Sequence, residues 1–455
     1  MTVFNPADLA RWTGGQWIAP PPPLIQGLHF DTRLMKSGSG FVALSQGERN
    51  GHDFLEASME AGAICAIVEQ ICHTRLPQLV VVDSMKALAD IAQAHRERFR
   101  QPVIGITGSC GKTSTKGILK GLLGNARCHV TPGNWNNCIG VPMTLFGLNT
   151  DQHNFAVIEA GISEVGEMKT LSGMIQPDLA IVTHVGPAHL DGLGSTAGVA
   201  REKASIMASA RSEARLIVPE SVYAFPEFKA LAARICLVLE GDTAVPEPAP
   251  AQYVRYYGTE NGIALLKKEY PFPSVSAGMR SNAALALVAA QMLQAEDFKG
   301  AQSLSSWKPD PHRGEYFDYE EQSFYVDCYN ANPASMLDAM RTFEATTPVE
   351  VKRAYVIGAM EELGTDAVAL HETIGRNLRL RENDFLCLVG PEHLTAGYLK
   401  GAQAAGIAAE QVTTTVSVGT IKSSIAAFKG AVFLKGSRAF KLETLLPEMP
   451  NFKPE

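Results

Sequence analysis

Short apolar runs separated by helical stretches recur along most of the chain and set its expected architecture. Between residues 102 and 307, four such runs stand at 103–106, 155–158, 179–182 and 216–218, with Gly, Pro or Asn close to each. Continuous apolar runs of strand length with helices between them are typical of a parallel sheet that is covered on both faces. The pattern therefore predicts a doubly wound α/β domain in the middle of the chain.

The same alternation resumes in the last third of the chain. Apolar runs stand at 324–326, 354–357, 385–389 and 432–434, and a helical pattern follows each of the first three. These runs predict a second doubly wound α/β domain of the Rossmann-like kind. The segment 303–311 between the two domains is predicted to be the hinge.

The first 99 residues form a smaller unit. Strands expected at 65–68 and 79–83 alternate with helical stretches, and a helix that starts near Ser84 ends where Gln101-Pro102 breaks the pattern. At roughly 150 residues per domain, the length of the chain also indicates about three domains. We therefore expect three α/β domains, at residues 1–99, 100–308 and 309–455.

The charge balance and the cysteines narrow the class of protein. Forty Lys and Arg stand against 47 Asp and Glu, a net charge of −7, so no basic excess is present to bind a nucleic-acid backbone or an anionic membrane. No stretch approaches the roughly 18 uninterrupted apolar residues of a membrane span. The eight cysteines are scattered without a C-x-x-C pair, which is typical of reduced thiols rather than of a disulfide framework or a zinc site. We expect a cytoplasmic protein that neither binds nucleic acid nor inserts into a membrane.

The most specific motif lies at the end of the first central strand, where residues 105–114 read GITGSCGKTS. A Gly-rich turn between a strand and a helix brings backbone N–H groups and the helix dipole against an anion. Lys112 can reach the outer phosphates of a nucleotide, and the Thr113 hydroxyl can bind Mg²⁺. Ile106 stands where the usual pattern has its first Gly. The context predicts a phosphate-binding loop, and the alternative is a strand–helix turn with a chance Lys-Thr pair.

Further polar groups are expected at the same edge of the central sheet. Residues 131–140 form an Asn-rich loop, Glu159 ends the second apolar run, and His184 and His189 follow the third. The carboxyl ends of parallel strands share one edge, and ligands bind there in open α/β sheets. Glu159 is therefore either a hydrogen-bonded cap or a metal ligand. Lys203 follows on a helix, and a solvated surface charge is its alternative interpretation.

Together these segments resemble the Mur ligases, a family of ATP-dependent amide ligases of peptidoglycan precursor synthesis. The phosphate loop of that family, T-G-(T/S)-x-G-K-(T/S), corresponds to residues 107–113. The further similar elements are DTR at 31–33, GFVAL at 40–44, GHDF at 51–54, GNWNN at 133–137, DCYNANPASM at 327–336 and KGSR at 435–438. The last two are specific to the branch that joins D-alanyl-D-alanine to UDP-N-acetylmuramoyl-tripeptide, so the resemblance implies these two substrates.

The resemblance also implies the chemistry. A substrate carboxylate attacks the γ-phosphate of ATP and gives an acyl phosphate and ADP, and the amine then displaces phosphate. ATP and Mg²⁺, with two metal ions, are the implied cofactors, and a carbamylated lysine is implied at Lys203, 14 residues beyond His189. A monomer is expected.

The site residues carried over from the resemblance fall into four groups. The implied ATP-binding residues are Gly108, Ser109, Cys110, Gly111, Lys112, Thr113, Ser114, Asn134, Asn137, Asn282, Arg313, Asp327 and Asn330. The implied metal ligands are Thr113, Glu159, His189 and Lys203 as its carbamate. The implied catalytic residues are Lys112, Glu159, His189 and Lys203. The implied substrate-binding residues are Thr32, Arg33 and His52 for the UDP-sugar, and Asn332, Lys435 and Arg438 for the peptide substrates.

The chain also departs from the family pattern at several positions. Ala359 replaces an Asp, His184 and Met279 each replace an Asn, and Arg313 stands in HRGE rather than in a G-R-x-E-like element. Three alternatives therefore stay open. Instead of the implied ligase for D-alanyl-D-alanine, the protein could be a Mur-type ligase with a different amine or a secondary-pathway substrate, a P-loop ATPase switch, or a nucleotide-binding scaffold without catalysis.

Overall fold

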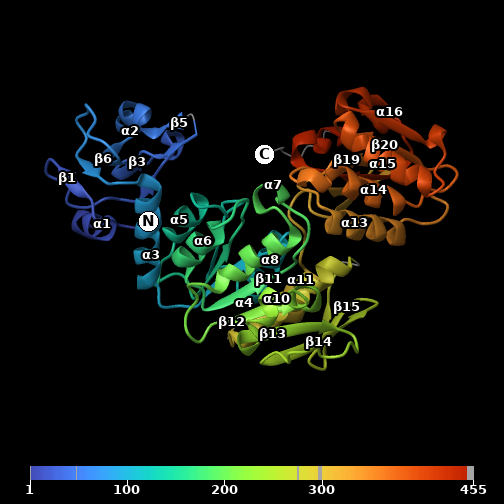
Figure 1. Ribbon diagram of the computed structural model, residues 1–455, viewed down its shortest axis with the longest axis horizontal. Helices are drawn as coiled ribbons and strands as arrows, with labels where there is room; N and C mark the ends of the chain where they lie inside the picture. The colour runs from blue at the N-terminus through green and yellow to red at the C-terminus, as the bar shows by residue number, and fades with distance from the viewer. Residues whose placement is uncertain (1, 48, 274–275, 296–299, 448–455) are drawn as a thin grey trace.

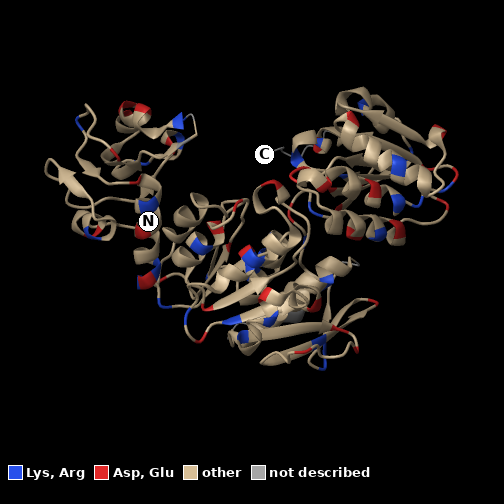
Figure 2. Cartoon of the chain, in the orientation of Figure 1, with Lys and Arg blue, Asp and Glu red and all other residues tan. Residues whose placement is uncertain are grey.

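The computed structural model describes residues 2–47, 49–273, 276–295 and 300–447. Three sheets of five, nine and six strands, with helices packed on them, form three lobes arranged in a V (Figure 1). The first lobe is blue, the central lobe green to yellow, and the last lobe orange to red. The predicted fold class is confirmed, and the domain boundaries at 99/100 and 308/309 stay predictions. Acidic and basic residues are interspersed in all three lobes (Figure 2).

The first sheet has the order β1-β7-β6-β3-β2 and is parallel except for β1. Its strands are β1 (Gln16–Ile18), β2 (Leu28–His29), β3 (Ser39–Val42), β6 (Ala63–Val68) and β7 (Gln78–Val80). The hairpin β4 (Ser45–Gln46) and β5 (Arg49–Asn50) and the helices α1 (Pro6–Thr13), α2 (Leu55–Glu60) and α3 (Ser84–Arg98) complete the unit. The Arg96 guanidinium at the end of α3 donates to Asp178 Oδ2 at 2.7 Å and to two carbonyl oxygens of the central unit. These bonds fix α3 to the central sheet.

The central sheet has the order β16-β15-β14-β13-β12-β11-β8-β10-β9. Its strands are β8 (Val103–Thr107), β9 (Cys128–Val130), β10 (Phe155–Glu159), β11 (Leu179–Val182), β12 (Arg215–Pro219), β13 (Ile235–Glu240), β14 (Gln252–Thr259), β15 (Gly262–Leu265) and β16 (Lys268–Pro271). The strands from β9 to β14 are parallel, and β15 and β16 pair antiparallel. The helices are α4 (Lys112–Leu123), α5 (Gly140–Leu145), α6 (Glu167–Ile175), α7 (Leu190–Leu193), α8 (Thr196–Ala204), α9 (Glu220–Tyr223), α10 (Pro226–Lys229), α11 (Ala277–Met292) and α12 (Gly300–Ser305).

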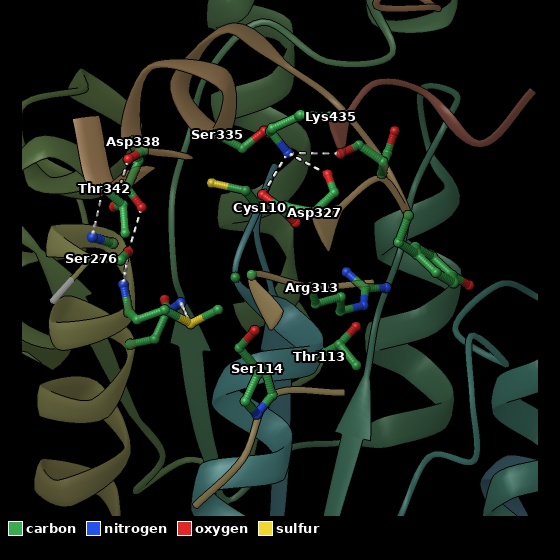
Figure 3. Close-up of a pocket in the computed structure, with 18 of the residues that line it drawn as sticks. Cys110, Thr113, Ser114, Ser276, Arg313, Asp327, Ser335, Asp338, Thr342 and Lys435 are labelled. Carbon is green, nitrogen blue, oxygen red and sulfur yellow. Dashed lines mark hydrogen bonds and ion pairs between the residues drawn. The ribbon is translucent and has the colours of Figure 1, made fainter. Parts of the chain in front are cut away.

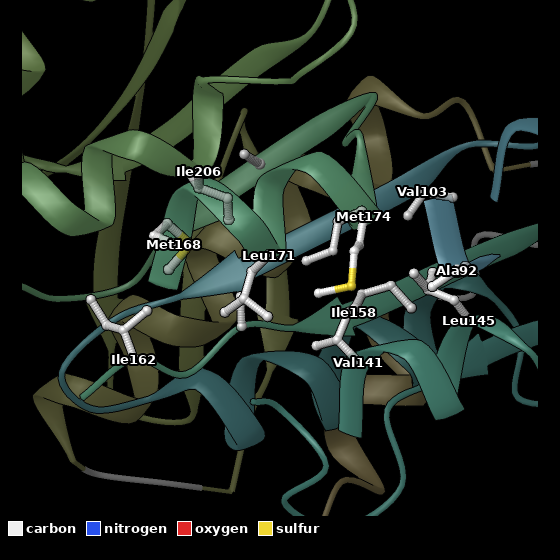
Figure 4. Close-up of a cluster of buried hydrophobic side chains, with 14 of the residues drawn as sticks. Ala92, Val103, Val141, Leu145, Ile158, Ile162, Met168, Leu171, Met174 and Ile206 are labelled. Carbon is white, nitrogen blue, oxygen red and sulfur yellow. The ribbon is translucent and has the colours of Figure 1, made fainter. Parts of the chain in front are cut away.

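Both faces of the central sheet are buried because successive side chains of a strand point to opposite faces. Val103 of β8 and Ile158 of β10 join Met174 of α6 in one core, which Figure 4 shows. Ile104 and Ile106 of β8 belong to the opposite core, with residues of α4 and α11. This two-sided burial is why β8 and β10 are continuous apolar runs in the sequence.

The C-terminal sheet has the order β17-β18-β22-β19-β20-β21 and is parallel except for β17. Its strands are β17 (Glu315–Tyr319), β18 (Gln322–Asp327), β19 (Arg353–Gly358), β20 (Phe385–Val389), β21 (Val412–Thr415) and β22 (Gly430–Lys435). Its helices are α13 (Pro333–Thr346), α14 (Ala367–Arg376), α15 (Glu392–Ala404) and α16 (Lys422–Ala426). The carboxyl ends of β18 and β22 lie next to each other, because these strands pair in parallel register up to Asp327 and Lys435.

The structure differs from the expectations in two places. The antiparallel extension β14–β16 was not predicted, because its strands are partly exposed and carry polar residues. The predicted hinge 303–311 begins inside α12, which packs against α4 and β16, so its first three residues are helical. Among the described residues, no helix is long and apolar enough to cross a bilayer.

Candidate active site

A cavity of about 1520 Å³ lies where the carboxyl edge of the central sheet meets the C-terminal unit (Figure 3). Residues of both units line it. Of the residues predicted to bind ATP, only Gly108 does not line this cavity. Those that line it are Ser109, Cys110, Gly111, Lys112, Thr113, Ser114, Asn134, Asn137, Asn282, Arg313, Asp327 and Asn330. The cavity therefore brings together groups from positions more than 200 residues apart in the sequence.

The phosphate-binding motif forms a tight turn between β8 and α4. Gly108 has φ +152°, and a Cβ there would lie 1.9 Å from Thr183 Oγ1, so only glycine fits. Gly111, with φ +84°, precedes the first residue of α4. The N-terminus of α4 and its unpaired backbone N–H groups thus face the cavity, which is the arrangement that binds phosphate.

Lys112 begins α4 and lines the same cavity. Its ammonium donates to the Gly108 carbonyl oxygen at 2.8 Å, so the side chain curls back over the turn. Burial lowers the pKa of Lys112, the negative charge of Glu159 opposes that shift, and Arg313 adds to it. Within the described residues, the Lys112 ammonium therefore has one backbone oxygen as a hydrogen-bond partner and no carboxylate in direct contact.

Glu159 ends β10 and is 2% exposed. Its carboxylate accepts hydrogen bonds from Thr113 Oγ1 at 3.2 Å and from Asn136 Nδ2 at 2.8 Å. Burial raises the pKa of this carboxyl, but the charges of Lys116 and Lys112 outweigh it and the pKa is lowered. Glu159 is consequently an ionised, buried carboxylate at the mouth of the phosphate loop.

Lys116 is a site residue that the sequence reasoning missed. Its ammonium lies 3.2 Å from Glu159 Oε2 and donates to the carbonyl oxygens of Thr131 and Gly133 at 2.9 and 3.0 Å. It lies four positions after Lys112 on α4, within a run of buried helical residues. A lysine on the buried face of the helix that follows a phosphate loop is a sequence signal that could have found it.

Lys203 lies on α8 and is 1% exposed. Among the described residues, no hydrogen bond or ion pair is formed by its ammonium, although the neighbouring Glu202 is also buried. Burial holds the pKa of Lys203 well below its ordinary range, and the charge of Lys112 lowers it further. The alternative of a solvated surface lysine is therefore wrong, and an ion pair with Glu202 is not formed.

His189 lies between the two units, one residue before α7. It has φ +54°, and its Nδ1 lies in direct contact with the Glu362 carboxylate of the C-terminal unit. The backbone N–H of Leu190 donates to the Glu362 carbonyl oxygen at 2.8 Å. Burial lowers the pKa of His189, and the Glu362 carboxylate opposes that shift. Glu362 is thus the residue that His189 contacts across the interface between the two units.

Lys435 and Asp327 form the opposite wall of the cavity (Figure 3). The Lys435 ammonium is 2.7 Å from Asp327 Oδ2 and also donates to the carbonyl oxygens of Asp327 and Asn330 at 3.2 and 3.1 Å. Burial raises the pKa of Asp327, and the Lys435 charge opposes that shift. All three N–H donors of Lys435 therefore have partners within its own unit.

The remaining predicted residues of the C-terminal unit lie close by. The Arg313 guanidinium stacks on the Tyr329 ring, 3.9 Å from its centroid. Asn332 caps α13 by accepting from Ser335 N, and its Nδ2 donates to the Ser109 carbonyl oxygen at 3.1 Å. Arg438 does not line the cavity. Its guanidinium pairs with Glu443 at 3.0 Å and lies 5.8 Å from the Tyr329 ring.

The residues predicted for the UDP-sugar lie in the first unit, outside the large cavity. Arg33 is 87% exposed and pairs with Asp31 at 2.6 Å, and Thr32 precedes it in a short 3₁₀ turn. His52 Nε2 accepts from Glu69 N at 3.0 Å. A second cavity, of about 670 Å³, lies between the first unit and the central one. Thr32, Arg33 and His52 do not line it.

Two protein oxygens beside the phosphate loop could hold Mg²⁺. No cluster of three or more His, Cys, Asp or Glu side chains that could hold a metal occurs in the described part of the chain. Thr113 and Glu159 nevertheless place a hydroxyl and a carboxylate oxygen 3.2 Å apart beside the phosphate loop. Mg²⁺ in nucleotide sites keeps several waters and takes one or two protein oxygens together with phosphate oxygens. These two residues fit an ion that arrives with a nucleotide.

Comparisons with known proteins agree with this geometry. The family model described as Mur ligase middle domain matches residues 106–243, and the one described as Mur ligase, glutamate ligase domain matches residues 312–438. The UDP-N-acetylmuramoyl-tripeptide–D-alanyl-D-alanine ligase of Bacillus subtilis strain 168 is 30% identical over 471 residues, which cover 98% of both chains. The chain belongs to the Mur ligase family. The enzyme of the same name from Escherichia coli K12 is 30% identical to this Mur ligase over 433 residues, covering 91% and 92% of the two chains.

Solved structures give the same result for the whole chain of this Mur ligase. A crystal structure of MurF from Acinetobacter baumannii superposes with a TM-score of 0.83 at 26% identity, over 97% of this chain and 98% of that one. MurF from Thermotoga maritima in complex with ADP superposes with a TM-score of 0.77 at 22% identity, over 92% and 96% of the two chains, and supports the fold.

Proposed function

We propose that this Mur ligase joins D-alanyl-D-alanine to UDP-N-acetylmuramoyl-tripeptide with ATP, in the cytoplasm, as a step of peptidoglycan precursor synthesis. The observation that carries the proposal is the shared cavity, in which the phosphate loop faces Arg313, Asp327 and Asn330 of the C-terminal unit. The curated relatives carry the name of this reaction over nearly the full chain length. The D-C-Y-N-A-N-P and K-G-S-R segments support the same branch.

The phosphate loop would bind the ATP phosphates through backbone N–H groups and the Lys112 ammonium. Thr113 and Glu159 would hold Mg²⁺, which when bound neutralises phosphate charge and orients the γ-phosphate. Lys112 would stabilise the charge that develops as the substrate carboxylate attacks the γ-phosphate. Asn332 and the His189–Glu362 pair hold the two units together, and their closure would exclude water from the acyl phosphate.

Lys203 would carry a carbamate, formed when its neutral amine adds to CO₂ and releases one proton. Its burial and lowered pKa favour the neutral amine that this addition requires. A carbamate converts a cation beside Lys112 into an anionic oxygen ligand, which with His189 suits a second Mg²⁺. The absence of any carboxylate partner for Lys203 among the described residues supports this role.

Lys435 would position Asp327 rather than bind a substrate carboxylate directly, because its three donors are already used within the C-terminal unit. Arg438 stays the candidate for a peptide carboxylate, since its guanidinium is partly exposed and has donors to spare. Thr32, Arg33 and His52 stay candidates for the UDP-sugar. The protein is proposed to act as a monomer.

A phosphate-release assay tests the proposal. We expect ADP and phosphate only when ATP, UDP-N-acetylmuramoyl-tripeptide and D-alanyl-D-alanine are all present. Hydrolysis without acceptor or amine would indicate a P-loop ATPase switch, and ATP binding without turnover would indicate a scaffold. Faster turnover with another amine would indicate a different Mur-type ligase. In that case Ala359, His184 and Met279 are the departures to examine first.

A further inference from the structure

The wall behind Glu159 contains a second lysine that the proposed reaction does not use. Lys116 lies on α4, one turn after Lys112, and is buried. Three oxygen atoms surround its ammonium: the carbonyl oxygens of Thr131 and Gly133 at 2.9 and 3.0 Å, and Glu159 Oε2 at 3.2 Å. An ammonium has three N–H donors, so its bonding capacity is filled. The ammonium thus occupies a small oxygen-lined cation site built into the protein.

The arrangement ties a polar loop to the carboxylate. Thr131 and Gly133 begin the loop that carries Asn134, Asn136 and Asn137, and Asn136 itself donates to Glu159 Oε1 at 2.8 Å. The Thr131 hydroxyl accepts from Glu159 N at 2.8 Å. Lys116 therefore joins α4, the loop and the end of β10 at one point. A shift of its side chain would move the carboxylate and the loop together.

The charges at this point oppose a free metal ion. One carboxylate, Glu159, faces the ammonium groups of Lys116 and Lys112, whose charges both act on it. A divalent cation that reached Glu159 without its own counter-charge would be repelled by the Lys116 ammonium, 3.2 Å from Glu159 Oε2, and by the charge of Lys112, and such repulsion is strong in a buried site. Nucleotide phosphates would reverse that balance, because they bring several negative charges to Lys112.

We propose that Lys116 is a positioning residue that acts through Glu159. It holds the carboxylate and the Asn134–Asn137 loop in place and, as the resident counter-ion, makes divalent-metal binding at Glu159 depend on the nucleotide. The inference rests on the proposed role of Glu159 as a metal ligand.

The test measures Mn²⁺ binding by electron paramagnetic resonance in the full-length protein without nucleotide. The wild type should bind Mn²⁺ weakly. Lys116→Met, whose side chain is unbranched, one atom shorter and uncharged, should bind Mn²⁺ at least about tenfold more tightly, because one of the two repelling charges is gone. The gain should disappear in the double variant Lys116→Met/Glu159→Gln. Adding the non-hydrolysable nucleotide AMPPCP should bring wild type and Lys116→Met close together.

Lys120→Met is the matched control, because Lys120 lies one turn further along the same helix and makes no ion pair with Glu159. It should bind Mn²⁺ as the wild type does. Unchanged Mn²⁺ affinity in Lys116→Met, or a gain that persists without Glu159, would overturn the inference. If Lys116→Met does not fold, Lys116→Gln keeps an N–H donor for the loop carbonyls and should show the same gain.

This readout does not depend on ligase activity. If the wild type released no phosphate with the two proposed substrates, the proposed function would fail while the Mn²⁺ comparison stayed valid. If the wild type were an active ligase and the Mn²⁺ affinities did not differ, the inference alone would fail.

Discussion

The lysines around the cavity fall into two classes. Lys116 and Lys435 each have a carboxylate partner, Glu159 and Asp327 respectively, and two backbone carbonyl oxygens. Lys112 has a single carbonyl oxygen as its hydrogen-bond partner, and Lys203 has none among the described residues. The first class lies beside buried or partly buried carboxylates, whereas in the second class Lys112 belongs to the phosphate loop and Lys203 lies on α8, buried and outside the lining of the cavity.

The difference indicates which cations are structural and which await a ligand. A buried charge is tolerated when it is paired and hydrogen-bonded, and it is strongly unfavourable when it is not. Burial lowers the pKa of both Lys112 and Lys203, and the charge of Lys112 lowers the pKa of Lys203 further. We infer that nucleotide phosphate supplies the counter-charge of Lys112, whereas addition of CO₂ to the neutral Lys203 amine would replace that cation by an anionic carbamate.

The largest expected effect is on the unpaired class. Lys112→Ala should lower the rate of ligation by a factor on the order of 10³ or more, because the transferring phosphoryl group loses the cation that stabilises its charge. Phosphate release by the purified variant, with circular dichroism to check folding, measures this. Lys120→Ala on the same helix is the control and should keep its activity. Near-normal turnover in folded Lys112→Ala would contradict the assignment of the phosphate loop.

The paired class should respond in stability. Lys435→Met should lower the free energy of unfolding of the C-terminal unit by about 3 kcal/mol, because it leaves Asp327 as an unpaired, largely buried charge. Urea denaturation measures this. The double variant Lys435→Met/Asp327→Leu should recover much of the loss. Equal losses in the single and double variants would show that the ion pair is not what stabilises this wall.

Lys203 should behave unlike either paired lysine. Lys203→Ala should lower the ligation rate about a hundredfold, because the proposed carbamate oxygen would no longer hold the second metal ion. Short-chain carboxylic acids added to the assay should restore part of the rate by supplying a carboxylate in the space left by the side chain. They should not rescue Lys112→Ala. Full activity of Lys203→Ala without added acid would rule out both the carbamate and any catalytic role.

The sequence pattern predicted the parallel strands well, and the reason is physical. Strands such as β8 and β10 are buried on both faces, so they are continuous apolar runs. The antiparallel strands β16 and β17 are half exposed and carry charged residues, so no comparable run marks them. The tight turn of the phosphate loop requires glycine at positions such as Gly108, and these glycines made the loop recognisable in the sequence.

The pairing of the lysines could not be predicted in the same way. Lys435 and Asp327 are 108 positions apart, and only the parallel register of β18 and β22 brings their ends together. The Lys116 ammonium donates to the Thr131 carbonyl oxygen, which lies 15 positions further along the chain. No local sequence pattern specifies the conformation of the chain that brings the two together. At Lys203, the position on a helix left a solvated surface charge as the alternative to the implied carbamate, and only the tertiary packing, which buries the side chain, excludes that alternative.

The last and smallest effect concerns the pH dependence of stability. In buffer free of CO₂ and divalent metal, Lys203 keeps its amine, whose pKa in the folded protein lies well below the ordinary value of 10.5. Between the folded pKa and 10.5, the unfolded chain binds more protons than the folded one. The free energy of unfolding of the wild type should therefore rise with pH, by at most about 1.4 kcal/mol per pH unit.

Lys203→Met has no titrating group at this position, so its free energy of unfolding should lack the rise with pH that Lys203 causes. We expect the variant to be more stable than the wild type at pH 7 and this difference in the free energy of unfolding to shrink as the pH rises to 9. Urea denaturation of both proteins across this range measures the difference. The stability curve of Lys120→Met should run parallel to that of the wild type, because Lys120 is partly exposed and forms no ion pair within the described part of the chain. Parallel curves for Lys203→Met would mean that Lys203 is protonated in both states. The neutral amine needed for a carbamate would then be missing, and Lys203 would belong with the paired lysines.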